Sequence, residues 1–279
     1  MVFCYPVSMT VRIAYLVMYD GSAFNGFSGG KGSVEHVIGR VLSRLNGSPV
    51  RLEKASRTDP GVSALMNVVA VDLSHELKIG LINSKLPRQV RVWGAAQVPP
   101  SFNPRKAMQR TYIYFSPSMG EDLESMRRAA AVFVGRHDLR NYMIRDGSPT
   151  VVEIHEVNVE EINGTISVEF KGRGFRNKML RKIMHAILMV GRGALSIDSL
   201  RRTIDTEEDI PMPPHQPHGL VLKEVRYENQ PSFSIDRAAL SYFARYLKDR
   251  LTEINAMSAS YELMLRSAMD GYWNGDSSP

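Results

Sequence analysis

The chain has 279 residues, of which 43% are hydrophobic, so it can supply a core for one large domain or for two ordinary ones. Its net charge of +6 and a pI near 9.4 point toward a polyanionic partner. The single cysteine, Cys4, excludes an intrachain disulfide and a multi-cysteine metal site, and we interpret it as favouring the reducing cytoplasm. The apolar segment 11–18 is too short to span a bilayer and contains Arg12, so no signal peptide or membrane anchor is expected.

The first hundred residues predict a strand-helix-strand-strand-helix-strand order. The clearest helix follows Ser33, a suitable N-cap, and its apolar residues recur at three- and four-residue spacing until Asn46-Gly47 supplies the stop. Three prolines between residues 99 and 104 disfavour regular structure and mark the end of this unit. The expected elements are strands at 12–19, 50–52, 67–73 and 90–98 and helices at 34–45 and 78–85.

The next hundred residues predict the same order again. A hairpin from 151 to 170 is expected to turn at Asn163-Gly164, a dipeptide typical of tight turns between antiparallel strands. Two successive units of this order predict an α+β protein with two ferredoxin-like (βαββαβ) halves, each with an antiparallel sheet and helices on one face. The other expected elements of this half are strands at 111–115 and 220–227 and helices at 121–134 and 176–190.

After Pro231 the chain becomes helical, and we interpret this part as a C-terminal appendage without a catalytic constellation. The predicted division is therefore 1–103, 104–230 and 231–279, with a loose tail from Gly271. One face of the appended helix is apolar and the other carries mixed charges; the apolar residues are Leu240, Phe243, Tyr246, Leu247, Leu251 and Ile254.

Positive charge is concentrated between Lys171 and Arg202, where nine basic residues stand against one acidic residue, Asp198, for a local net charge of +8. Such a concentration suits phosphate binding, because each neutralised phosphate releases condensed counterions. A solvated helix face is the competing interpretation, and charge alone does not decide between the two.

The loop 55–64 contains Arg57-Thr58-Asp59-Pro60-Gly61-Val62, which by composition alone reads as a turn. This loop resembles the RTDxGVHA signature of the TruA family of tRNA pseudouridine synthases. Six other blocks resemble family motifs in the correct order, so that the resemblance covers about residues 12 to 227: Tyr19-Asp20-Gly21 with Gly26; Asn83 to Pro87 with Val90-Arg91-Val92; Phe102 to Arg105 with Arg110-Thr111-Tyr112-Ile113-Tyr114; Phe133 to Leu139; Phe175 to Lys182 with Gly191; and Pro217 to Leu222.

The resemblance implies an enzyme that isomerises uridine to pseudouridine in tRNA, at positions 38 to 40 of the anticodon stem-loop. It implies a merged antiparallel sheet around a central basic cleft and a homodimer. Because no external group enters or leaves in this isomerisation, no cofactor is expected. Asp59 is expected to be the catalytic carboxylate, Arg181 its ion-pair partner, and Tyr112 the residue that stacks on the base and assists removal of the C5 proton. The residues expected to bind substrate or RNA are Arg57, Leu222, Lys178, Lys182 and Arg202.

The chain departs from the family pattern beside the predicted carboxylate. Pro60 stands where the family usually has Lys or Ala, Ser63 replaces the usual His, and Ser28 replaces the usual Gln. These changes leave Asp59 in place and affect only the contacts that flank it.

Two other classes of protein share some of these features. A non-catalytic RNA-binding protein on a ferredoxin-like platform is the main alternative, but no RNP-type pattern of aromatic residues is present. A glycosidase or nucleosidase would need a second acid near Asp59 in the sequence, and none stands there. Among the histidines only His215 and His218 are closely spaced, and without a cysteine or acidic ligand beside them they favour no metal site.

Overall fold

The computed structural model describes residues 10–269; Cys4 and the tail predicted from Gly271 lie outside this range. Within it, ten strands form one mixed sheet in the order β10-β4-β1-β3-β9-β5-β8-β7-β6, with β2 paired to β3. The strands are β1 (Val11–Tyr19), β2 (Glu53–Lys54), β3 (Ser63–Leu73), β4 (Val90–Gln97), β5 (Gln109–Pro117), β6 (Gly135–Asp138), β7 (Val151–Ile162), β8 (Thr165–Gly172), β9 (Leu220–Arg226) and β10 (Ser234–Ile235).

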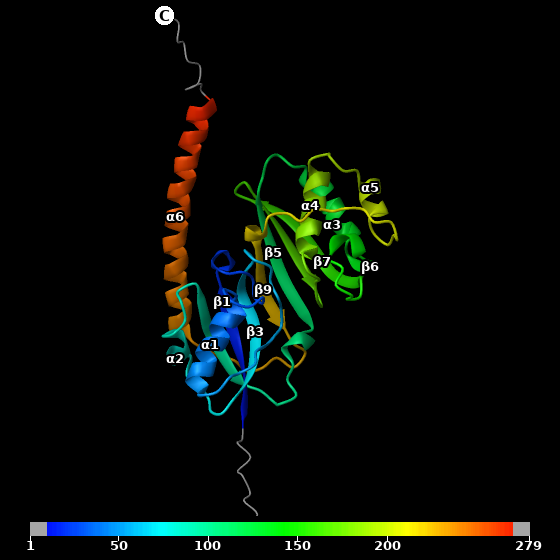
Figure 1. Ribbon diagram of the computed structural model, residues 1–279. Coiled ribbons are helices and arrows are strands. Elements are labelled where there is room, and N and C mark those ends of the chain that lie inside the picture. The colour runs from blue at the N-terminus through cyan, green and yellow to red at the C-terminus, as the bar shows by residue number, and fades with distance from the viewer. Residues whose placement is uncertain (1–9, 270–279) are drawn as a thin grey trace, which may run out of the picture.

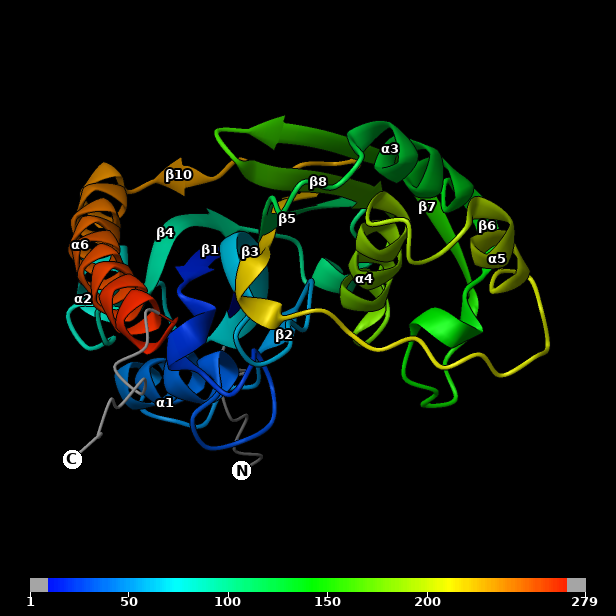
Figure 2. The ribbon, with the colours of Figure 1, turned by 90° about the horizontal axis from the view of Figure 1, so that it is seen from above.

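Six α-helices accompany the sheet in the described part of the chain: α1 (Val34–Asn46), α2 (Ile79–Asn83), α3 (Leu123–Val132), α4 (Met179–Gly191), α5 (Ile197–Arg202) and α6 (Arg237–Met269). Seen from above, α1 and α4 lie on the same side of the curved sheet (Figure 2). A continuous hydrophobic core extends beneath both halves of the sheet.

The same strand order occurs twice. In the first half it is β4-β1-β3-β2, and in the second half it is β9-β5-β8-β7. The halves join where β3 and β9 pair in parallel, with Ser63 opposite Val221 and Ala64 opposite Leu222. The short β2 pairs only with residues 69 and 70 of β3, so the other end of β3 is open to β9. The prediction of an antiparallel merged sheet is therefore wrong at this seam, and the sheet is mixed.

Local signals placed several elements correctly. The Ser33 hydroxyl accepts the backbone N–H of His36 and caps α1, and Gly47 ends the helix in the left-handed conformation with φ of 75°. The predicted hairpin is confirmed: β7 and β8 are joined by Asn163 and Gly164, both at positive φ.

Other elements begin at residues that differ from the predicted ones. The strand expected at 50–52 is wrong, since β2 occupies 53–54, and β3 begins at Ser63 rather than at 67. The helix expected from 176 begins only at Met179, because Lys178 adopts a left-handed conformation with φ of 60° that a regular helix does not admit. Three short elements, β6, α5 and β10, had no expected counterpart.

The C-terminal helix α6 is 33 residues long and begins at Arg237, after β10 pairs with β4. Its first turns pack on the sheet, where Phe243 and Tyr246 form a small buried cluster with Met18. Its far end extends well beyond the rest of the molecule (Figure 1). No helix in residues 10–269 is both long and apolar enough to cross a bilayer.

Candidate active site

The loop 55–62 enters β3 and carries Asp59, which lines a cavity. Its backbone is fixed on the side of the first half, where the N–H of Phe27 donates to the carbonyl of Thr58 at 3.0 Å. The hydroxyls of Tyr19 and Thr58 are hydrogen-bonded at 2.8 Å. Gly61, at φ of +85°, makes the turn that follows Asp59, and a Cβ there would lie 2.9 Å from Pro217. The carboxylate of Asp59 therefore projects from a backbone that has little freedom.

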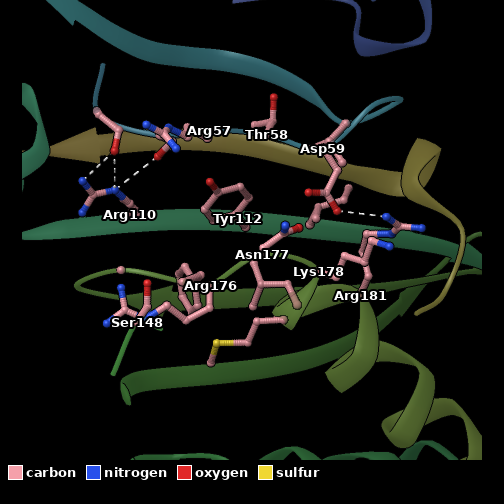
Figure 3. A pocket seen from close by; sticks show the side chains of 18 of the residues that line it. Arg57, Thr58, Asp59, Arg110, Tyr112, Ser148, Arg176, Asn177, Lys178 and Arg181 are labelled. Carbon is pink, nitrogen blue, oxygen red and sulfur yellow. Dashed lines mark hydrogen bonds and ion pairs between the residues drawn. The ribbon is translucent and has the colours of Figure 1, made fainter. Parts of the chain in front are cut away.

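Two buried side chains hold the start of the same loop from below. Asn67 accepts the N–H of Ser56 at 3.2 Å and donates to its carbonyl at 3.0 Å. Arg110, only 7% exposed, donates to the carbonyl of Ala55 at 2.8 Å, on the side of the loop that carries Arg57 (Figure 3). It also donates to the carbonyl of Arg173 in the facing loop. Burial lowers the pKa of Arg110. This guanidinium joins the two loops that face each other across the cavity.

Asp59 and Arg181 form an ion pair, with 2.9 Å between Oδ2 of Asp59 and a terminal guanidinium nitrogen (Figure 3). Their side chains are 18% and 13% exposed, so the pair is largely shielded but open on one side. Arg181 lies in the first turn of α4, and its Nε donates to the carbonyl of His215 at 2.8 Å. The predicted contact between Asp59 and Arg181 is thus present, and the orientation of the guanidinium is fixed from two directions.

The carbonyl that holds Arg181 belongs to residues 211–219, here called the strap, which contains four prolines. The N–H of His215 donates back to the carbonyl of Arg181 at 2.9 Å. The buried hydroxyl of Tyr114, on β5, donates to the carbonyl of Gln216. Burial raises the pKa of Tyr114 to about 12, so its hydroxyl remains a donor at neutral pH. The strap is therefore hydrogen-bonded both to β5 and to Arg181, so the position of Arg181 depends on that of β5.

Tyr112 lines the cavity between Asp59 and Arg110 (Figure 3). It is 7% exposed, and its ring meets that of Phe175 edge to face at a centroid distance of 5.5 Å. Burial raises the pKa of Tyr112, so its hydroxyl is neutral at physiological pH. The Tyr112 side chain can therefore stack on a base or form hydrogen bonds through its hydroxyl, but it is not a phenolate in the free enzyme.

The cavity measures about 1170 Å³. Eight basic side chains line it against four acidic ones, so its surface is basic: the cations are Lys54, Arg57, Arg105, Arg110, Arg173, Arg176, Lys178 and Arg181, and the anions are Glu35, Asp59, Asp146 and Glu153. Among the described residues, the cations without a carboxylate within ion-pair distance include Arg57, Arg105, Arg173, Arg176 and Lys178, whereas Lys54 is paired with Glu35 and Arg181 with Asp59.

Five of the predicted site residues line this cavity, namely Arg57, Asp59, Tyr112, Lys178 and Arg181. The structure does not bring the other three into it. Leu222 pairs with Tyr112 in the sheet but is fully buried, and Leu220 lines the cavity in its place. The ammonium of Lys182 donates to the carbonyl of Asn141 at 3.1 Å, and burial lowers the pKa of Lys182.

The third residue outside the cavity is Arg202, at the end of α5, where it donates to the Ser199 hydroxyl at 2.8 Å. It belongs to the basic stretch, which the fold divides. Only its members Arg173, Arg176, Lys178 and Arg181 reach the cavity. Others pair with acids from elsewhere, such as Lys171 with Glu156 and Arg192 with Glu121. A net charge counted along the sequence therefore overstates the charge of the surface.

Sequence reasoning missed several residues that shape this site. Arg110 and Tyr114 belong to one of the motif blocks, and residues 217–219 of the strap belong to another, but no role was predicted for them. Arg105, Arg173 and Arg176 could have been found from the same blocks and from the basic stretch. In the sequence these residues are marked only by a motif or by their charge. Their function depends on which loops face each other across the cavity, and the sequence does not show this.

Metal binding finds no support in residues 10–269, where no cluster of three or more His, Cys, Asp or Glu side chains could hold an ion. The ring of His215 lies against Tyr114 at a centroid distance of 5.7 Å. The ring of His218 lies next to Gly61, within 3.0 Å of the place a Cβ would take. Both histidines therefore have packing contacts in the strap.

A carboxylate-guanidinium pair lines a basic cavity, and a mixed sheet with two similar halves carries it. This arrangement fits the class of enzymes that act on a polyanion. A family model described as tRNA pseudouridine synthase matches residues 129–228. The chain is similar to tRNA pseudouridine synthase A of Pyrobaculum arsenaticum, with 42% identity over 257 residues, which are 90% of this chain and 97% of that protein.

Two further relatives bear the same name. The protein of Pyrobaculum islandicum is 40% identical over 90% of this chain and 96% of its own length. The protein of Pyrococcus furiosus is 32% identical over 90% of this chain and 97% of its own length. The chain belongs to the TruA family of tRNA pseudouridine synthases.

Proposed function

We propose that this tRNA pseudouridine synthase modifies uridines of the anticodon stem-loop, at positions 38 to 40, with Asp59 as its catalytic carboxylate. The observation that carries the proposal is the ion pair of Asp59 and Arg181 in the wall of the basic cavity, with 2.9 Å between the charged atoms. A guanidinium at this distance favours the charged form of a carboxylate and fixes its direction.

The reaction cleaves the N1–C1′ bond of uridine, turns the detached uracil and rejoins it through C5. No external group enters or leaves. Two routes use an anionic carboxylate in the first step: Asp59 attacks C1′, or it removes a proton from the 2′ carbon. A 2′-deuterated uridine distinguishes them, because only the second route predicts a primary isotope effect on the cleavage step.

Tyr112 is proposed to act on the detached base. Its ring lies on the cavity wall near Asp59, where it can stack on uracil, and its hydroxyl is neutral because burial raises the pKa. We therefore assign it a relay role in C5 deprotonation, in which it accepts that proton while it passes its own to another acceptor. Leu220, which lines the cavity, takes the place of Leu222 as the apolar residue that keeps water from the detached ribose.

Substrate binding is proposed to depend on the cavity cations that have no carboxylate partner. A uridine in a stem or loop must leave its stack to reach Asp59, which costs a few kcal/mol. Phosphate contacts from Arg57, Arg173 and Lys178 can offset that cost. Recognition would then follow the shape and phosphate path of the RNA, since A-form grooves present little sequence information to side chains.

The finer points of architecture and setting are part of the same proposal. The repeated strand order supports two ferredoxin-like halves, residues 1–103 and 104–230, around the basic cavity, with 231–279 as an appendage. The family resemblance supports a homodimer that works in the cytoplasm.

The test is the substitution Asp59→Asn, which keeps size and shape and removes the charge. Pseudouridine in a tRNA transcript is measured by carbodiimide labelling, and tRNA affinity is measured by filter binding on the same preparation. We expect product formation to disappear while the affinity stays the same or rises slightly, because one anion facing a polyanion is gone. Retained product formation in Asp59→Asn would overturn the assignment of Asp59.

The alternative is a non-catalytic RNA-binding protein, and the same two measurements distinguish it from the enzyme. It would bind the transcript equally well as wild type and as Asp59→Asn, and neither protein would form pseudouridine. Release of free uracil by the wild-type protein would instead indicate a nucleosidase.

A further inference from the structure

The far half of α6 carries large apolar side chains on its surface. The first turns are covered by the sheet: Phe243 and Tyr246 are 4% exposed, and the Tyr246 hydroxyl donates to Asp20 at 2.6 Å. From residue 251 onward this cover ends. The exposed fractions then lie between 49% and 76% at Leu251, Ile254, Met257, Tyr261, Leu263, Met264, Leu265 and Met269.

All but one of these side chains share a single face of the helix. At 100° per residue, these side chains fall within an arc of roughly 140°. The same arc contains the residues that pack on the body of the protein, namely Leu240, Phe243, Tyr246 and Leu247. Leu263 alone lies elsewhere. The apolar stripe is therefore one surface, covered over its first half by the protein's own sheet and uncovered over its second half. A patch of this kind marks an interaction surface.

The spacing within the uncovered half is that of a coiled-coil seam. Steps of three and four residues alternate along it, through Leu251, Ile254, Ser258, Tyr261, Leu265 and Ala268. This 3.5-residue period keeps one line of side chains facing a second helix. The segment 251–269 is roughly 28 Å long at 1.5 Å per residue. Its outer end projects past the rest of the molecule, where a second helix can reach it (Figure 1).

We propose that residues 251–269 pair with the same segment of a second copy of this chain, as an antiparallel two-helix coiled coil about a twofold axis. In that arrangement each seam residue of one copy lies opposite a seam residue of the other copy, and the two residue numbers of every such pair add to the same value. Ile254 then meets Leu265, and the two small seam residues each meet a large one, Ser258 opposite Tyr261 and Ala268 opposite Leu251. The seam is thus complementary in size to its own reverse, as a twofold interface requires.

The charge of the segment favours a protein partner over RNA or an anionic membrane. It holds two acidic residues, Glu253 and Glu262, against one basic residue, Arg266, so it offers no attraction to phosphate. Beside the seam, Asn255 of one copy lies near Glu262 of the other in the antiparallel pairing, where the amide can donate to the carboxylate.

The first test is sedimentation of the full chain. We expect a dimer at micromolar concentration for the wild type and a monomer for Ile254→Glu, which places a charge in the seam. The matched control is Ala256→Glu on the opposite face of the same helix, which should remain a dimer. Circular dichroism of each variant shows whether α6 stays helical, so that loss of the dimer is not mistaken for unfolding.

The second test fixes the orientation. In a Cys4→Ser background, Ser258→Cys combined with Tyr261→Cys should form interchain disulfides on mild oxidation, while Ser258→Cys alone should not. Efficient crosslinking of the single variant indicates a parallel pair and overturns the antiparallel arrangement.

This inference rests on the homodimer of the proposed function, and the outcomes separate the two. A monomeric wild type overturns both. A dimer that survives Ile254→Glu keeps the homodimer and overturns this surface. A monomeric wild type whose tRNA affinity falls in Ile254→Glu and not in Ala256→Glu would show that the face binds RNA instead.

Discussion

The two walls of the cavity are built in opposite ways. One wall, the carboxylate wall, consists of the loop 55–62 together with Arg181 and the strap. Apart from Arg57, which has no carboxylate partner within residues 10–269, its polar groups are held by internal bonds, such as the 2.9 Å ion pair of Asp59 and the 2.8 Å bond from Arg181 to the carbonyl of His215. The other wall, the basic wall, is the loop 173–178. Arg173 and Lys178 there have no ion-pair partner among the described residues.

The difference separates orientation from attraction. A group that reacts must stay within a fraction of an ångström of its productive position, and bonds formed before the substrate arrives hold it there. A group that attracts a phosphate gains from having no internal partner, because it then exchanges only counterions and water. Changes on the carboxylate wall should therefore affect turnover, and changes on the basic wall should affect affinity.

The largest effect is expected from Arg181→Ala. The change removes the partner that keeps Asp59 ionised and aimed, and turnover should fall by roughly 10² to 10³, the cost of losing a preorganised charge at an active site. Single-turnover rates at saturating enzyme measure this apart from binding. Arg181→Lys should recover only part of the rate, since lysine cannot bond Asp59 and the His215 carbonyl with one planar group. Full activity in Arg181→Ala would remove Arg181 from the site.

A somewhat smaller effect is expected from Tyr112→Phe, which keeps the stacking surface and removes the hydroxyl. Loss of a proton relay slows its step by about 10²-fold, so complete turnover should fall while tRNA affinity stays the same. An enzyme-bound intermediate, with the glycosidic bond cleaved and C5 still protonated, should accumulate after mixing. Turnover at the wild-type rate in this variant would show that the Tyr112 hydroxyl has no role in the reaction and that its ring serves only in packing.

The sequence predicted those features of the fold that depend on local signals. The cap at Ser33, the left-handed Gly47 and the Asn163-Gly164 turn were readable because each is set by residues within a few positions. The parallel seam between β3 and β9 was not, because it depends on how little of β3 the two-residue β2 covers. That length follows from tertiary packing and has no signature in the chain.

The candidate site divides in the same way. Asp59, Tyr112 and Arg181 were found through motif resemblance, and the structure places all three on one cavity. Arg202 was assigned to RNA binding by its charge alone, and the fold carries it away on α5. The function of Arg110 could not be predicted, because most of its hydrogen-bond acceptors are backbone carbonyls, which leave no pattern of residue types.

On the basic wall, the combined substitution Arg173→Gln and Lys178→Gln should weaken tRNA binding with little change in single-turnover rate at saturating enzyme. Two lost phosphate contacts should make the slope of log affinity against log salt shallower by about 1.5 to 2. The matched control is Arg201→Gln with Arg202→Gln, which removes the same charge outside the cavity. An equal loss in the control would show that overall charge, and not this wall, determines affinity.

The smallest effect concerns pH and the strap. Burial lowers the pKa of His215 below its ordinary value of 6.5, and the nearby His185, Arg192 and Arg181 lower it further. A histidine with a depressed folded pKa contributes stability that is full above pH 6.5 and is lost as the pH falls through the folded pKa, because the unfolded chain binds the proton more readily.

The free energy of unfolding, measured in urea at pH 7.5 and 5.5, should therefore fall on acidification by less in His215→Gln than in the wild type. The difference should be below about 1 kcal/mol, since the ring is half-exposed and solvent screens its charge. The exposed His75→Gln serves as the control and should follow the wild type. Because a charged His215 would repel Arg181 and loosen the strap, single-turnover rate should decline in the same range while tRNA affinity holds. If the single-turnover rate and the tRNA affinity declined together on acidification, the carboxylate wall and the basic wall would not be independent.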